Sequence, residues 1–163
     1  MDTILFATDG SPSAKAAEKE AFTLAKATGW RVRVVTVWRI PILTGYGFAP
    51  TPYVPELADE EREHAQNVAQ AAVEAAKAAG VEATWELRQG DAPEEICAAA
   101  KETAARLIVM GAHGWGTFQR LVFGSVSTAV LHHAASPVLI VRGPDEEKAV
   151  AVPAAKPVET AVR

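Results

Sequence analysis

Short apolar runs alternate with longer segments of helical spacing along nearly the whole chain, and few folds accommodate that order. Strands that are apolar on both faces and alternate with helices are typical of a parallel sheet covered on both sides. Right-handed crossovers leave few topologies for such a chain. We predict a single-domain α/β fold, a doubly wound, Rossmann-like open sheet of five parallel strands in the order 3-2-1-4-5. The predicted strands are 3–8, 31–38, 81–88, 107–110 and 137–142, and the predicted helices are 12–28, 56–79, 92–105 and 125–134.

Capping and turn residues mark where these segments begin and end. Ser11 is a suitable N-cap, and Pro12 fits the first position of the helix that follows. Gly29 is suited to ending that helix. Prolines and glycines exclude a regular element from residues 39–55. That stretch is interpreted either as a surface loop packed on the helices or as a flap over a ligand or partner site.

Composition excludes several classes of protein. The 163 residues suggest one domain, and a net charge of −4 disfavours a general nucleic-acid binder. A single cysteine excludes an internal disulfide and a Cys-rich zinc site. No apolar run approaches a bilayer span, and the N-terminus lacks the basic segment of a secretory signal. We expect a cytoplasmic protein without membrane or nucleic-acid partners, with a domain at 1–143 and a flexible tail at 144–163.

The fold prediction also indicates where a ligand binds. In open doubly wound sheets, ligands lie outside the carboxyl ends of the strands, where the strand order reverses. Here that point lies between the first strand, ending Ala7-Thr8-Asp9, and the fourth, ending Met110-Gly111. These two ends are therefore the predicted walls of the binding site.

The loop after the fourth strand is punctuated by glycines and opens a helix. Gly111 and Gly114 allow tight turns and close approach to a ligand, and Gly124-Ser125 begins a helix whose N–H groups favour an anion. The hydroxyls of Ser125 and Ser127 add donors. Thr117 stands where a P-loop needs lysine, and the dinucleotide fingerprint is absent, so neither of those phosphate motifs applies.

The chain resembles the universal stress protein family, whose nucleotide-binding members carry G-x2-G-x9-G-[S/T]. That pattern is intact as Gly111-x2-Gly114-x9-Gly124-Ser125. The segments 7–11 and 131–142 are also similar to the family, and the resemblance covers residues 1 to about 143.

The resemblance implies a homodimer that binds ATP, with Mg²⁺, usually without strong catalysis. Ala7 and Thr8 would line the adenine side, and Val37 would contact the base through its backbone. Asp9 would contact the ribose or a phosphate-bound Mg²⁺, the only metal role predicted. The remaining predicted residues form the floor and the phosphate side: Met110, Gly111, His113, Gly114, Gly124, Ser125, Val126 and Ser127.

Several of these residues also have ordinary structural interpretations. Asp9 can cap the helix that starts near Ser11, and His113 can be an exposed loop histidine. His132 and His133 suit a helix C-terminus better than a metal site. Cys97 is expected to be a buried structural thiol. Arg120 either reaches a phosphate or solvates the loop, and Trp115 is expected to be a half-exposed loop aromatic.

The fifth strand is predicted at an edge of the sheet. Val138-Leu139-Ile140-Val141 is apolar, and an exposed apolar edge favours pairing with another chain. A two-fold dimer joining two such edges antiparallel would cover it.

Three functions remain open. The first is an ATP-binding regulatory dimer in stress response that also contacts a protein partner, with slow or no ATP hydrolysis and no catalytic residue. The second is an adenylating enzyme of a related fold, although the expected Ser-Gly-Gly-x-Asp-Ser loop after the first strand is missing. The third is a dimeric partner-binding protein without nucleotide.

Overall fold

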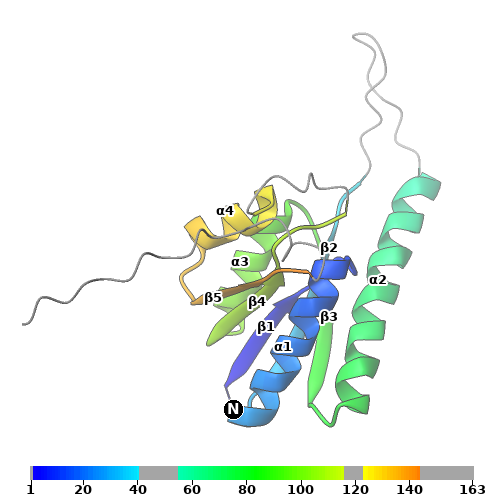
Figure 1. The fold of residues 1–163 in the computed structure, drawn as a ribbon. Coiled ribbons are helices and arrows are strands. Elements are labelled where there is room, and N and C mark those ends of the chain that lie inside the picture. Colours follow the sequence, from blue (N-terminus) through cyan, green and yellow to red (C-terminus); the bar gives the residue numbers. More distant parts are fainter. Residues whose placement is uncertain (1, 41–54, 116–122, 144–163) are drawn as a thin grey trace, which may run out of the picture.

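The sheet has five parallel strands in the order β3-β2-β1-β4-β5, which confirms the predicted fold class (Figure 1). The computed structural model describes residues 2–40, 55–115 and 123–143. The strands are β1 (Thr3–Ala7), β2 (Arg31–Trp38), β3 (Ala83–Gln89), β4 (Leu107–Gly111) and β5 (Val138–Val141). The helices are α1 (Pro12–Thr28), α2 (Pro55–Ala78), α3 (Ala92–Glu102) and α4 (Ser125–His133).

The helices cover the sheet in two layers, each with its own core. Alternate residues of β1 and β2, such as Phe6 and Val34, pack against α1 and α2. Their neighbours in sequence, such as Leu5 and Val35, pack against α3 and α4 on the other face. Because both faces are buried, the strands are continuously apolar, which is the pattern from which the parallel sheet was predicted.

The termini of α1 follow the predicted capping residues. The Ser11 side chain accepts a hydrogen bond from the backbone N–H of Ala14 at 3.3 Å, and Pro12 is the first helical residue. Gly29 has φ 72°, and its N–H donates to the carbonyl of Ala25. The left-handed conformation at Gly29 ends the helix, and it strains residues with a side chain.

Two element boundaries differ from the prediction by two or more residues. The third strand begins at Ala83 rather than Val81, because the N–H of Val81 donates to Ala76 and belongs to the end of α2. Helix α3 ends at Glu102 rather than near 105, because Ala104 takes φ 47° and turns the chain into β4. Three predictions fall outside the described residues: the flap, for positions 41–54 of the stretch 39–55, Arg120, and the tail at 144–163.

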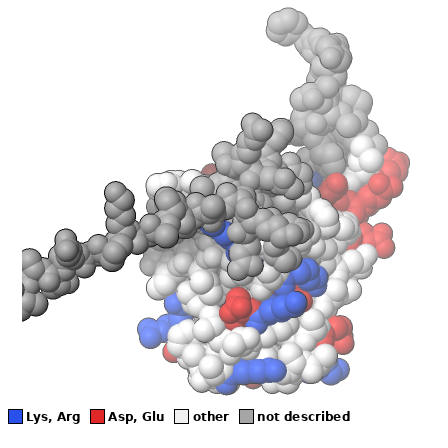
Figure 2. All heavy atoms as spheres, in the orientation of Figure 1, with Lys and Arg blue, Asp and Glu red and all other residues white. Residues whose placement is uncertain are grey.

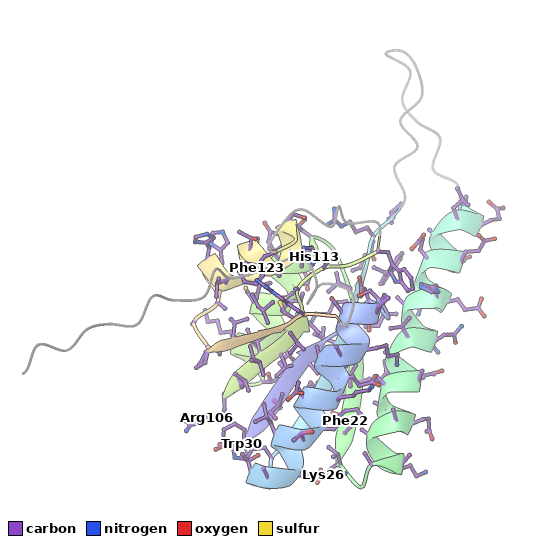
Figure 3. The ribbon with its side chains drawn as sticks, viewed as in Figure 1. Phe22, Lys26, Trp30, Arg106, His113 and Phe123 are labelled. Carbon is purple, nitrogen blue, oxygen red and sulfur yellow. The ribbon has the colours of Figure 1, made fainter. Side chains whose placement is uncertain are left out.

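Different labelled side chains mark the two ends of the sheet (Figure 3). At the amino ends of the strands, the Arg106 guanidinium lies 5.9 Å from the centre of the Trp30 ring. His113 and Phe123 lie at the opposite end, beside the start of α4. The loops at that carboxyl end are where the ligand site is predicted.

Helix α2 lies close to the sheet because its buried face consists of alanine. Ala69 and Ala76 have no exposed surface, and the helix packs on β2 and β3. Because these buried side chains are small, the packing depends on their size.

We expect Ala69→Leu to lower the thermal unfolding midpoint by about 2–12 °C, since overpacking costs about 1–3 kcal/mol. Ala71→Leu is the matched control, because Ala71 is exposed on the same helix. Differential scanning calorimetry measures both. Equal midpoints for the two variants would contradict the close packing of α2.

Candidate functional site

A cavity of about 430 Å³ lies at the carboxyl ends of β1 and β4, and we call it the switch-point cavity. All twelve residues that the sequence predicted for a ligand site line it. They are Ala7, Thr8, Asp9, Val37, Met110, Gly111, His113, Gly114, Gly124, Ser125, Val126 and Ser127.

Sequence reasoning missed other residues in the cavity wall. Arg39 follows the end of β2, and Ala92 and Ile96 come from the first turns of α3. Arg39 lies two residues beyond Val37 at the same carboxyl edge of β2. Trp115 also lines the cavity, as do Ala14, Val35 and Ala112.

All four helices begin at this edge, because each follows a parallel strand, and three of them reach the cavity. The starts of α1, α3 and α4 contribute Ala14, Ala92 and Ser125 to the wall. The first turn of a helix has backbone N–H groups without intrahelical acceptors and a partial positive charge. The cavity is therefore suited to an anionic group.

The two serines at the start of α4 differ in what their hydroxyls do. The Ser127 hydroxyl is buried and lies within hydrogen-bond distance of the carbonyls of Ala112, at 2.8 Å, and Gly124, at 3.0 Å. It therefore fastens the start of α4 to the end of β4. Ser125 is exposed and lines the cavity, which leaves its side chain accessible to a ligand.

The loop after β4 is held against the start of α1. The Ser13 hydroxyl donates to the carbonyl of His113 at 2.6 Å and accepts from its N–H at 3.1 Å. The Ser11 hydroxyl lies 3.2 Å from the same carbonyl. A Cβ on Gly111 would lie 2.3 Å from the Ser13 Oγ and 2.7 Å from the N of Ala14. Only glycine permits this approach, so Gly111 has a structural role as well as a place in the wall.

Asp9 lines the cavity and does not cap α1, because Ser11 is the N-cap and Asp9 accepts a hydrogen bond in the turn before it. Its Oδ1 accepts from the N–H of Ser11 at 3.0 Å, and its carbonyl accepts from the Trp115 Nε1 at 2.9 Å. A Cβ on Gly114 would lie 2.6 Å from Asp9 Oδ2. The glycine loop therefore lies directly against the carboxylate.

The other candidate residues lie away from this site or have ordinary roles. His132 and His133 are exposed in the last turn of α4. Cys97 is half-buried rather than fully buried, and burial raises the pKa of its thiol. Among the described residues, no group of three or more His, Cys, Asp or Glu side chains could hold a metal ion. None of the helices within those ranges is long and apolar enough to cross a membrane.

The fold and the cavity define a doubly wound α/β protein with an anion-compatible site at the switch point. The chain belongs to the universal stress protein family, since the model of that family matches residues 1–142. Universal stress protein YxiE of Bacillus subtilis is 32% identical over 147 residues, which cover 87% of this chain and 99% of the relative.

Solved structures show the same fold. Universal stress protein UspA from Lactobacillus plantarum has a TM-score of 0.75 at 26% identity, covering 86% of this chain and 97% of the other. The Archaeoglobus fulgidus universal stress protein in complex with dAMP has a TM-score of 0.63 at 26% identity, with coverage of 86% and 97%. A universal stress protein in complex with cAMP has a TM-score of 0.64 at 26% identity, with coverage of 86% and 96%.

We expect Ser13→Ala to destabilise the protein by about 1–3 kcal/mol, because it removes two hydrogen bonds to the backbone of His113. The thermal midpoint should fall by about 2–12 °C. Thr23→Ala removes an exposed hydroxyl that donates to the carbonyl of Lys19, and it should change stability by less than about 0.5 kcal/mol. Indistinguishable calorimetric midpoints for the two variants would refute the anchoring role of Ser13.

Proposed function

We propose that this chain is an ATP-binding regulatory protein of the cytoplasm that acts in stress response, with Mg²⁺ accompanying the nucleotide. The observation that carries the proposal is that the complete glycine pattern and both strand ends line one cavity. Its volume of about 430 Å³ lies within the range of small-molecule sites. Related structures in complex with dAMP and cAMP support an adenine nucleotide as the ligand class.

The chemistry of the wall fits the parts of ATP. Val37, Met110 and Ile96 offer apolar surface for a base. Asp9 would accept hydrogen bonds from the ribose or approach Mg²⁺. The N–H groups of the glycine loop and the Ser125 side chain would hold the phosphates. The resident nucleotide would supply negative charge at the start of α4, where the helix dipole favours it.

We expect turnover of bound ATP to be slow or absent. The described residues of the wall include no lysine to bridge phosphates and one imidazole, that of His113. A general base needs a positioned partner and reach to the attacking water. Bound ATP would therefore act by ordering the loop after β4 and changing the surface offered to a protein partner.

The direct test is thermal unfolding with and without Mg-ATP. At a thousandfold excess over Kd, ATP should add about 4 kcal/mol and raise the midpoint by about 8–16 °C. Gly114→Ala should remove most of this shift, because its Cβ would lie 2.6 Å from Asp9 Oδ2 and displace the carboxylate.

Gly29→Ala is the matched control for the glycine substitution. It introduces the same methyl group at φ 72° with no atom within 4 Å, far from the cavity. We expect it to lower the midpoint in the absence of ATP but to keep the ATP shift. No shift in the unmodified protein at millimolar ATP would refute nucleotide binding and favour the partner-binding dimer.

We further propose that the protein is a homodimer joined through β5. This strand is at the edge of the sheet, and Val138, Leu139, Ile140 and Val141 are all half-exposed. The carbonyls of Pro137 and Val141 accept from the N–H groups of Ile108 in β4 and of Ala112, the residue after β4. By the alternation of a parallel strand, the N–H and carbonyl of Ile140 therefore point toward the free edge. A second β5, antiparallel across a two-fold axis, would pair with them.

Light scattering of the unmodified protein should give twice the chain mass of 17.3 kDa. Ile140→Pro should give the monomer mass, because proline lacks the N–H at the free edge while sparing the β4 ladder. Ile140→Ala shortens the same side chain but keeps that N–H, and it should remain dimeric. A monomeric unmodified protein, or equal masses for the two variants, would contradict pairing through β5.

A further inference from the structure

A second cavity, of about 520 Å³, lies between the end of β2 and the N-terminal half of α2. We call it the β2–α2 cavity. Its wall consists of Asp9, Thr36, Val37, Trp38, Arg39, Glu61, His64, Ala65, Val68 and Trp115. It meets the switch-point cavity at four of these residues, Asp9, Val37, Arg39 and Trp115. Among the described residues, the glycines of the loop after β4 and the start of α4 do not line it.

Thr36 is a buried polar residue in the wall of this cavity whose hydroxyl has no structural role in the described part of the chain. It is 3% exposed, and its Oγ1 makes no hydrogen bond among the described residues. It shares the α1 and α2 face of β2 with Val32 and Val34, whose side chains belong to the apolar core. A valine at 36 would have the same shape without burying an unpaired hydroxyl, which costs free energy. Thr36 thus lines the cavity with a hydroxyl that has no hydrogen-bond partner among the described residues.

The rest of the wall combines aromatic surface with negative charge. Trp38 and Trp115 contribute indoles, and Asp9 and Glu61 contribute carboxylates. The guanidinium of Arg39 lies 3.5 Å from Asp91, which offsets its charge. Figure 2 shows further acidic side chains over the N-terminal end of α2, where Asp59, Glu60, Glu61 and Glu63 are exposed. This setting disfavours a second anion and favours a cation with an aromatic ring.

We propose that the β2–α2 cavity binds a small protonated aromatic amine. The ammonium group would lie near Asp9 and Glu61, the ring would pack against the indoles, and Thr36 would accept or donate the hydrogen bond it lacks. This site takes a different ligand from the proposed ATP site, and the two adjoining cavities share Asp9, Val37, Arg39 and Trp115. Neither the charge nor the lining of the β2–α2 cavity suits a polyphosphate.

Isothermal titration calorimetry with tryptamine tests the proposal. We expect saturable binding to the unmodified protein. Thr36→Val should weaken it about tenfold, as expected for a hydrogen bond to a charged ligand, while the unfolding midpoint stays the same or rises. Glu61→Gln should weaken it about three- to fivefold. Indole-3-acetate, which carries the opposite charge on a similar ring, should not bind.

Glu63→Gln is the matched control, because Glu63 is exposed on the same helix but does not line the cavity. It should leave tryptamine binding unchanged. Absence of saturable binding, or equal weakening by the substitutions at 61 and 63, would overturn the proposal.

ATP titrations of the same samples keep the two proposals apart. Ser125→Ala alters the switch-point cavity alone, so it should weaken ATP binding and not tryptamine binding. Tryptamine binding without ATP binding would refute the proposed function and leave this site standing. The reverse result would refute only this site.

Discussion

The paired hydrogen bonds between Ser13 and the backbone of His113 join the start of α1 to the loop after β4, beside the switch-point cavity. They hold the loop after β4 against the first turn of α1, and Gly111 makes the approach possible. The β1–β4 ladder brings the ends of these strands together, and the Ser13 contact positions His113, which lines the switch-point cavity. Ser127 then fastens the start of α4 to the same loop.

This arrangement explains why glycines and small hydroxyl residues are concentrated in the wall. At Gly111 and Gly114, an added Cβ would meet Ser13 or the Asp9 carboxylate, so side chains are excluded by neighbours rather than by ligand alone. The helix starts make this cavity suited to an anion, without a lysine in the described wall. Part of the glycine spacing in this loop therefore serves the folded chain before any ligand is bound.

Much of this could be predicted from sequence, because the relevant signals are local. The strands are apolar on both faces, and Ser11, Pro12 and Gly29 mark the ends of α1 by their own backbone preferences. The switch-point rule then placed the ends of β1 and β4 at the site, and the resemblance to the universal stress protein family supplied the individual residues, all twelve of which line the cavity.

What sequence could not supply depends on contacts between distant segments. The turn at Ala104 uses an alanine with positive φ, which carries no composition signal. Arg39 and Ile96 join the cavity because α3 packs beside the end of β2. The unpaired hydroxyl of Thr36 is visible only once α2 is placed over β2. Ser127, read from sequence as a phosphate ligand, has its hydroxyl engaged by two carbonyls.

The central claim is that the switch-point cavity binds ATP through the glycine loop. The most direct test follows backbone amide shifts by ¹H–¹⁵N NMR as Mg-ATP is added, with adenosine as the comparison. The account predicts saturable changes that are largest at Gly111, Gly114, Gly124 and Ser125 and smaller there with adenosine. Unchanged amides at these positions, or changes centred elsewhere on the molecule, would contradict it.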